Sequence, residues 1–475
     1  MSNCAGPMRL QVLALSLAIG VPLAAQEVVH PVELPPISMS EAAAIPLRDP
    51  QPRVFTHRLL PPLRYGVRAA ASLTVTAVTT PTIAAPPVTA LFDADASRAL
   101  VPADSAGAVG RTHVVSTNNA RIIVQDRAGK ILKTVSQDQF WSLSPGALPV
   151  GEYYDPRVAY DASADRWILL AIHDEKAIAF AISETGDPAG VWRRYMLDEP
   201  GADFSMLAVT RDRLVIGTNT SGGDGTLLSS MRKQDLYNRA PEIDALRYRI
   251  NKQFLLPVSS NGGQQYIVVT DGSGITVMNL NDLAWSINVH EPNDWDTAPF
   301  RTLPQFSSVA LDAGYGLLEA VAERDGWIYA VMIRDVGPDT QAVAWCRVNT
   351  TTRQSEWGAV GDPVRAARFA YPSLAVNRYG GMLIGFGTFA SDRYPSSAYV
   401  YRDFMGRVSN IAPIRAGTDA VTVHERWGDY TTTVIDPLDD ASFWTVQIHA
   451  KNGSWATSWA KVEMNVVGKR RAVRR

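Results

Sequence analysis

The stretch YDPRVAYDASADRWILLAIHD, residues 154–174, decides the expected fold, because it reads as a hairpin that recurs along the chain. Its first half alternates small and apolar residues, and a polar turn at Asp161 leads into a second, strongly apolar strand. Aspartate suits such a turn because its side chain accepts a hydrogen bond from the backbone two residues further on. The pattern therefore predicts two antiparallel strands joined by a short turn.

The hairpin pattern recurs in four more clear copies and two weaker ones. The clear copies turn at Arg211, Asp312, Asn377 and Asp436, and they are DFSMLAVTRDRLVIGTNTS (203–221), QFSSVALDAGYGLLEAVAE (305–323), AYPSLAVNRYGGMLIGFGT (370–388) and DYTTTVIDPLDDASFWTVQIH (429–449). The weaker copies span 107–136 and 252–280, and further strands follow where they can be traced, as at 178–183 and 191–197. About seven such units predict an all-β fold, a β-propeller of seven four-stranded blades over 101–466. Because the last unit shows three strands, we expect its fourth to come from the N-terminal side and close the ring.

The N-terminus has the pattern of a secretory signal peptide over residues 1–25. Arg9 precedes an apolar run over 10–21, and small residues lead to a predicted cleavage near Ala25. We therefore expect an exported protein that is periplasmic, secreted or at the cell surface. After cleavage Cys346 is the remaining cysteine, so no intrachain disulfide can form. No second transmembrane candidate follows the signal peptide.

Residues 26–100 and 467–475 differ in character from the repeats. Prolines interrupt the first segment again and again, so we expect a poorly ordered leader with one short strand at 71–78. The C-terminal segment carries five Lys or Arg residues and is expected to be a solvated basic tail.

Composition excludes several classes of function. Lys and Arg number 45 against 47 Asp and Glu, which argues against a nucleic-acid binder because such proteins concentrate positive charge. Motifs such as G-x-S-x-G, H-E-x-x-H, C-x-x-C and the phosphate-binding loop are absent from the sequence. We expect a monomer that needs no cofactor, with Ca²⁺ as the one open possibility.

Several segments in the repeat region resemble a group of secreted bacterial β-propeller proteins of uncharacterised function, which are sometimes termed sialidase-like because of their fold. The resemblance covers about residues 100–465 and supports both the propeller and export. It implies no catalytic residues, because none is assigned in that group. The segments are D-S-A-G-A-V-G (104–110), D-P-x-V-x-Y-D-x-x-x-D-R-W (155–167), G-D-P-x-G-x-W (186–192), R-W-G-D-Y (426–430) and D-P-x-D-D-x-x-F-W (436–444).

The residues that open the inner strands are the candidate site, because in a propeller these strand ends ring one mouth of the central channel. The expected cluster consists of Asp155, Arg157, Asp203, Arg368, Arg426 and Asp429. Converging carboxylates could hold Ca²⁺ or act as acid and base in glycoside cleavage, and arginines could grip an anionic sugar. The simpler alternative is that the aspartates accept backbone N–H groups at strand corners and pair with the arginines.

The aspartates in two turns form a weaker set of calcium candidates. They are Asp161, Asp165, Asp436, Asp439 and Asp440. The spacing D-x-[DN]-x-[DN]-G is absent, which favours turn-capping over metal binding.

The sequence leaves three functions open. The first is a binding module that recognises a glycan or a cell-surface protein through the channel mouth. The second is a secreted glycoside hydrolase or lyase that uses Asp155, Asp203 and Asp429, and the third is a structural surface module. Carboxylate oxygens about 5–10 Å apart around an open pocket would favour hydrolysis, whereas carboxylates engaged at backbone corners would favour binding.

Overall fold

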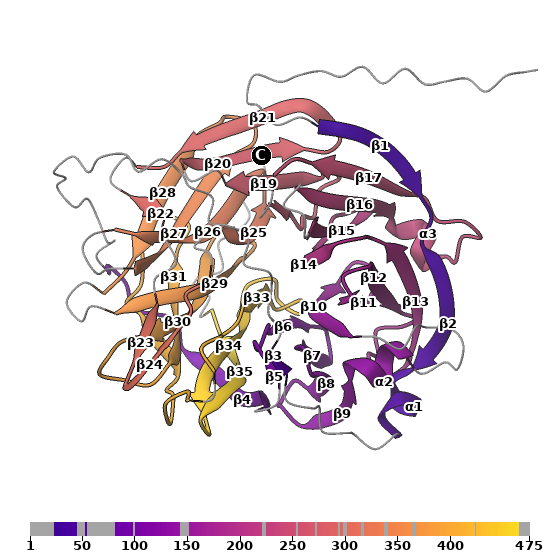
Figure 1. Ribbon diagram of the computed structural model, residues 1–475. Coiled ribbons are helices and arrows are strands. Elements are labelled where there is room, and N and C mark those ends of the chain that lie inside the picture. The colour runs from indigo at the N-terminus through magenta and orange to yellow at the C-terminus, as the bar shows by residue number, and fades with distance from the viewer. Residues whose placement is uncertain are drawn as a thin grey trace, which may run out of the picture.

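A computed structural model describes residues 23–44, 53–54, 81–97, 100–142, 152–220, 225–252, 255–270, 273–292, 295–297, 302–314, 318–336, 341–362, 367–422 and 424–464. Seven antiparallel sheets are arranged as a ring around a central axis (Figure 1). The prediction of an all-β, seven-bladed propeller with four-stranded blades is confirmed. The described helices are short, and they are α1 (Met39–Ala44), α2 (Gln137–Ser142) and α3 (Lys233–Tyr237).

The first four blades follow one another along the chain. Blade 1 comprises β6 (Ala106–Val109), β7 (His113–Thr117), β8 (Arg121–Asp126) and β9 (Ile131–Ser136). Blade 2 comprises β10 (Tyr153–Asp161), β11 (Arg166–His173), β12 (Ala177–Ser183) and β13 (Val191–Asp198). Blade 3 comprises β14 (Ala202–Val209), β15 (Arg213–Thr220), β16 (Thr226–Arg232) and β17 (Ala245–Ile250). Blade 4 comprises β18 (Leu256–Pro257), β19 (Tyr266–Thr270), β20 (Gly274–Asn279) and β21 (Asp282–His290).

The remaining blades complete the ring. Blade 5 comprises β25 (Leu318–Arg324), β26 (Trp327–Asp335), β27 (Gln341–Asn349) and β28 (Ser355–Val360), with β22 (Asp296–Thr297) beside β26. Blade 6 comprises β29 (Arg368–Val376), β30 (Met382–Phe389), β31 (Ser396–Arg402) and β32 (Ala412–Arg415). Blade 7 comprises β33 (Thr432–Ile435), β34 (Phe443–Lys451), β35 (Ser454–Val462) and β4 (Val88–Ser97). Two small sheets accompany the ring, namely β23 (Leu303–Gln305) with β24 (Ser307–Leu311), and β3 (Arg53–Val54) with β5 (Leu100–Val101).

Strand β4 closes the ring from the N-terminal side, as the strand count of the last repeat predicted. It pairs antiparallel with β35 along nearly its whole length, from Ser97 opposite Trp455 to Val88 opposite Val462. Blade 7 thus combines the last three strands of the chain with a strand that precedes blade 1. This closure removes the open edge that an unfinished last blade would expose.

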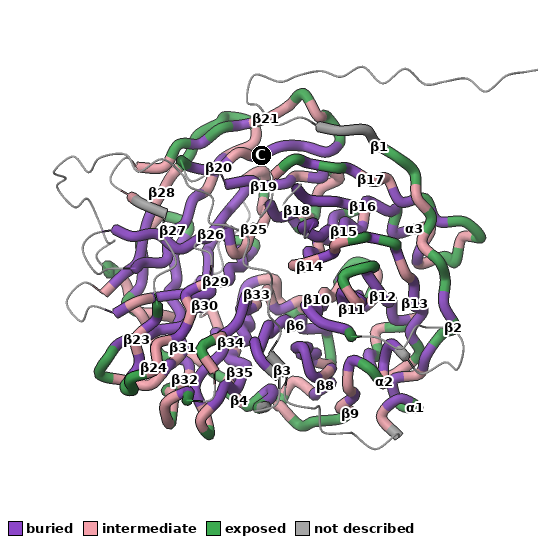
Figure 2. The backbone as a smooth tube through the Cα atoms, viewed as in Figure 1, coloured by how far each residue is buried: buried purple, intermediate pink, exposed green. Residues whose placement is uncertain are grey.

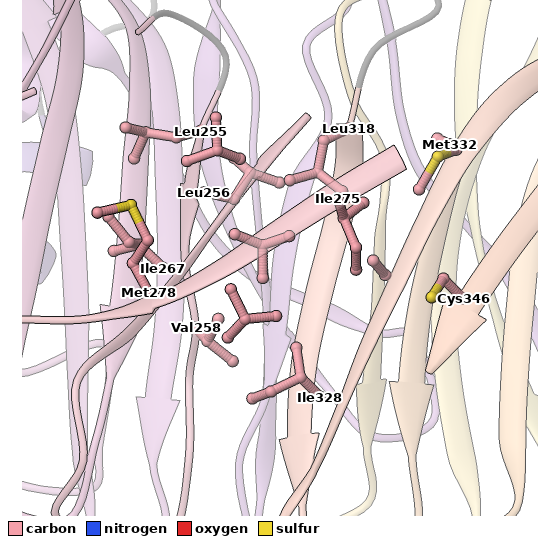
Figure 3. Packing of buried hydrophobic residues seen from close by; sticks show 14 of the residues in the cluster. Leu255, Leu256, Val258, Ile267, Ile275, Met278, Leu318, Ile328, Met332 and Cys346 are labelled. Carbon is pink, nitrogen blue, oxygen red and sulfur yellow. The ribbon is translucent and has the colours of Figure 1, made fainter. Parts of the chain in front are cut away.

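The apolar core lies between the blades rather than at one centre. Buried residues follow the strands and exposed ones gather at outer turns (Figure 2). Blades 3, 4 and 5 share one cluster, which includes Ile275, Met278, Leu318 and Ile328 (Figure 3). Buried tryptophans fill several of the other junctions, and those under 2% exposed include Trp141, Trp167, Trp192, Trp427 and Trp444.

One glycine of blade 1 is required by a tryptophan of blade 2. A Cβ atom added at Gly110 would lie 2.5 Å from the Trp167 ring, closer than packed atoms approach. The two sheets therefore meet at this position only if the residue has no side chain.

The proline-rich leader contains strands where its prolines predicted irregular chain. Strand β1 (Leu23–Val29) adds a fifth strand to blade 3, and β2 (Val32–Ser38) adds one to blade 2. Both are outer edge strands, where a proline can be tolerated because its missing N–H need not face a partner. The buried Arg194 fixes this segment by donating to the carbonyl of Pro35 at 2.8 and 3.0 Å. The predicted cleavage near Ala25 falls within β1.

The prediction for the repeat copy at 305–323 is wrong in its first strand. Residues 305–311 were expected to form an inner strand turning at Asp312, but β24 pairs with β23 outside the seven sheets. The inner strand of blade 5 is β25, and its turn is formed by Asp325 and Gly326, both with positive φ. An Asp-Gly turn between two strands is the stronger hairpin signal, and its two left-handed residues match the twist of the strands.

Three predictions concern residues outside the described ranges. They are the short strand at 71–78, the basic tail at 467–475 and most of the signal peptide. Among the residues that the structure describes, no helix is long and apolar enough to cross a membrane.

Candidate functional site

A local distortion recurs where the inner strands begin. The pairing of β10, β14, β25 and β29 with the next strand shifts register in the first few residues. Asp155, Phe204 and Tyr371 lie at three of these shifts with φ between 49° and 55°. Positive φ is uncommon for residues other than glycine, and bulges of this kind re-aim side chains next to binding sites.

Three aspartates converge at this end of the axis. Potential ligand atoms of Asp104, Asp155 and Asp429 all lie within 4.8 Å of one another, and all three residues are buried. They come from the segment before β6, from β10 and from the segment before β33. Carboxylate oxygens at this separation have the chemistry to hold a hard divalent cation such as Ca²⁺. A second group of possible ligands, His30, Glu242 and Asp244, is exposed.

The aspartate cluster also joins neighbouring blades through backbone N–H groups. Oδ1 of Asp104 accepts from the N–H of Asp429 at 2.8 Å, which links blades 1 and 7. Oδ2 of Asp155 accepts from the N–H of Phe204 at 3.0 Å, which links blades 2 and 3. Asn119 donates to Asp104 at 2.6 Å and accepts from the N–H of Asp155 at 2.8 Å. These contacts match the corner-capping alternative considered from the sequence.

Arg426 supplies positive charge beside the cluster. Its Nη2 lies 2.9 Å from both carboxylate oxygens of Asp429, and its Nε lies 3.4 Å from Asp312. Burial alone would lower the pKa of the guanidinium, but Asp429 and Asp312 raise it above its usual value. Burial raises the pKa of the Asp312 carboxyl, although Arg426 and a hydrogen bond from Tyr371 oppose the shift.

An axial cavity of about 740 Å³ begins just beyond the aspartates. Along β6, β10 and the segment that leads into β33, its lining starts at Ala106, Arg157 and Thr431, each two residues after one of the three aspartates. The lining continues to the turns that end the inner strands, where Asp161 and Asp440 contribute. The aspartates therefore lie behind one end of the cavity, which we call the floor, and the turns form its mouth.

Arg157 and Glu319 are the ionisable groups of the floor. The Arg157 guanidinium lies 3.3 Å from the centroid of the Tyr430 ring, and its Nε donates to the carbonyl of Ser205 at 2.9 Å. Glu319 is half-buried and lies at the register shift of β25. Burial raises the pKa of its carboxyl well above the usual range; Asp429 adds to the rise and Arg157 opposes it.

The calcium candidates of the turns have other partners. Asp161 accepts from Lys233 at 2.6 Å and from the hydroxyl of Tyr237 at 2.8 Å. Asp165 accepts from Tyr160. Asp436 accepts from the Trp444 indole at 3.0 Å and pairs with Arg127, Asp439 caps backbone N–H groups of its own turn, and Asp440 pairs with Arg324. Within the described ranges, these residues form no cluster of three ligands within 4.8 Å.

The structure brings together part of the predicted site. Asp155 and Asp429 lie together, Arg426 pairs with Asp429, and Arg157 lies on the cavity floor. Asp203 is not part of the aspartate cluster, and the N–H of Asp203 donates to the hydroxyl of Thr218 at 2.8 Å. Arg368 donates to the carbonyl of Thr302 instead.

Sequence reasoning missed three site residues. Asp104 opens the D-S-A-G-A-V-G segment and precedes a strand in the way that Asp429 does, so its position was a usable signal. Glu319 was missed because the repeat of blade 5 was aligned to 305–311, ahead of the true inner strand. Asp312 had been assigned to a turn and lies instead beside Arg426.

Comparison with known proteins gives similarity to solved structures alone, since no family model and no curated protein matches this chain. One similar structure is the WD40 domain of SCAP from fission yeast, at 8% identity, covering 74% of this chain and 82% of that one, with a TM-score of 0.34. Another is the SapL1 lectin in complex with alpha methyl fucoside, at 7% identity, covering 66% and 96%, with a TM-score of 0.37. A GH43 glycoside hydrolase with an engineered active site covers 77% and 95% at 10% identity and a TM-score of 0.30. Similarity at this level carries no conclusion about what this chain binds.

Proposed function

We propose that this protein is an exported binding module that holds a glycan in the axial cavity of its propeller. The proposal rests on that cavity, whose volume of about 740 Å³ falls in the range of small-molecule sites. Its walls combine apolar positions such as Leu207 and Val321 with hydroxyls such as Ser259 and Thr432. Such a mixture suits a sugar, which presents both C–H faces and hydroxyl groups.

The arrangement of the acids supports binding over hydrolysis. The three clustered aspartates lie within 4.8 Å of one another, closer than the spacing expected of a hydrolytic pair around bound water. Asp104 and Asp155 accept backbone N–H groups of neighbouring blades, and Asp429 pairs with Arg426. Their oxygens are thus committed to holding the ring together.

We include in this proposal that the protein is exported and that its partner is a glycan. Signal cleavage near Ala25 would place the propeller in the periplasm, in the medium or on the cell surface, where glycans are available. A cell-surface protein could present the same chemistry through its attached sugars.

Blocking the mouth of the cavity tests the proposal. Ala162 is exposed on the turn after β10 and lines the cavity, so Ala162→Trp should obstruct entry without disturbing the core. We expect the affinity for the best ligand of a glycan panel to fall at least about tenfold, because bound sugar and indole would compete for the same volume. Titration calorimetry of the mature protein measures the change.

Ala128→Trp is the matched control. Ala128 is also exposed on a turn, between β8 and β9, but it does not line the cavity. Equal glycan affinity in wild type and Ala162→Trp would contradict the proposed site, and failure of every glycan in the panel to bind would contradict the proposed function.

A further inference from the structure

The cations that line the axial cavity differ in whether an acid neutralises them. Lys233 pairs with Asp161 at 2.6 Å, and the other two cations near the mouth, Arg211 and Arg324, pair with Asp212 and Asp440. Within the described part of the chain, Arg157 forms no ion pair with an acidic side chain. It is therefore the cavity cation whose charge is left for a ligand.

The surroundings of Arg157 fix its guanidinium in place. The group lies on the face of Tyr430 at 3.3 Å and 5.3 Å from the centroid of Phe204, and its Nε is held by the carbonyl of Ser205. Tyr430 is itself fixed, because its hydroxyl donates to the carbonyl of Pro156 at 2.9 Å. Nη1 and Nη2 have no hydrogen-bond partner among the described residues. A guanidinium held in this way loses little further freedom when it binds a planar anion through its two terminal nitrogens.

Glu319 lines the same floor, and among the described residues it forms no ion pair with Arg157. Burial raises the pKa of its carboxyl, and the nearby charge of Asp429 adds to the rise. A raised pKa favours the protonated carboxyl, which can donate one hydrogen bond from its O–H group to an anion on the same floor. In that protonated form the residue carries no negative charge that would repel the ligand.

We propose that Arg157 and Glu319 bind the carboxylate of an acidic sugar, so that the glycan of this cavity carries a hexuronate unit. The inference rests on the proposed function and names the class of its ligand. The carboxylate would meet Nη1 and Nη2 of Arg157 at the floor, and the sugar ring would extend along the hydroxyl and apolar walls toward the mouth. A neutral sugar of the same shape would leave the positive charge of Arg157 without a partner.

The test compares acidic and neutral sugars that are otherwise identical. The mature protein is titrated calorimetrically with glucuronate and galacturonate oligosaccharides and with the corresponding glucose and galactose oligosaccharides. We expect the acidic member of at least one pair to bind about tenfold or more tightly, as a charge-assisted, two-pronged hydrogen bond predicts. This comparison uses the wild-type protein and so does not depend on how well a variant folds.

Two variants then test whether the preference for the acidic sugar arises from Arg157 on the cavity floor. Arg157→Gln should abolish the preference for the acidic sugar, whereas Arg232→Gln should preserve it, since Arg232 is an exposed arginine outside the cavity lining. Equal binding of acidic and neutral sugars overturns the hexuronate inference but leaves glycan binding standing. A preference that persists in folded Arg157→Gln also overturns the inference, and absence of binding by all these sugars and by the wider panel overturns both proposals.

Discussion

At the scale of single residues, His449 couples the stability of the propeller to pH. It lies on β34 with 2% of its surface exposed. Burial lowers the pKa of its imidazole to about 4, and Arg415 and Lys451 contribute in the same direction while Asp93 opposes them. The folded protein therefore holds this histidine neutral at pH values where the unfolded chain, with an ordinary value of 6.5, becomes protonated.

We predict that this residue makes the fold less stable as the pH falls from about 6.5 to 4. Over that window the unfolded state binds more protons, so the free energy of unfolding decreases, by at most about 3 kcal/mol from this group. Urea unfolding at pH 7, 5.5 and 4.5 measures the slope. His449→Gln should flatten the slope, and His290→Gln, a change at an exposed position, should leave it as in wild type. An unchanged slope in His449→Gln would refute the assignment.

The residues of the site were predictable where they open a recognisable strand. Asp155, Asp429 and Arg426 could be placed together because their segments share one pattern. The pattern could not show that Arg157, two residues after Asp155, lies on the floor of the cavity, because that depends on the height of each residue along the axis. Nor could it show that Asp203 stays apart, since a one-residue bulge at Phe204 redirects the side chains around it.

At the scale of elements, β4 is the strand on which ring closure depends. Its Ala94 is 3% exposed and packs with Trp444, Val446 and Trp459 between blades 7 and 1. The neighbouring Leu91 on the same strand is 40% exposed. The strand count of the last repeat predicted this closure, whereas the alignment of blade 5 failed because residues 305–311 imitate the alternation of an inner strand.

We predict that Ala94→Asp is far more destabilising than Leu91→Asp. The first change places an unpaired carboxylate in an apolar junction, which costs about 3–5 kcal/mol, and the second leaves the charge in contact with water. The midpoint of urea unfolding for the two variants provides the measurement. Equal midpoints would show that β4 does not seal the junction between blades 7 and 1.

At the scale of the whole molecule, the ring separates two kinds of chemistry along one axis. The starts of the inner strands form a buried layer of acids and Arg426 that joins blades 1, 2, 3 and 7. The middles and ends of the same strands line the cavity. From the sequence, all of these residues were predicted to gather at one mouth of the channel. The order of the strands along the chain does not show how far along the propeller axis each residue lies.

The most direct test of ligand binding in the axial cavity is a crystal structure of the mature protein grown with the tightest-binding hexuronate oligosaccharide. The predicted result is sugar density inside the ring, with its carboxylate within hydrogen-bonding distance of Arg157 and Glu319 and its chain leading past Ala162. Sugar bound at the outer face of a blade, or at the aspartate cluster with the cavity empty of sugar, would contradict the account.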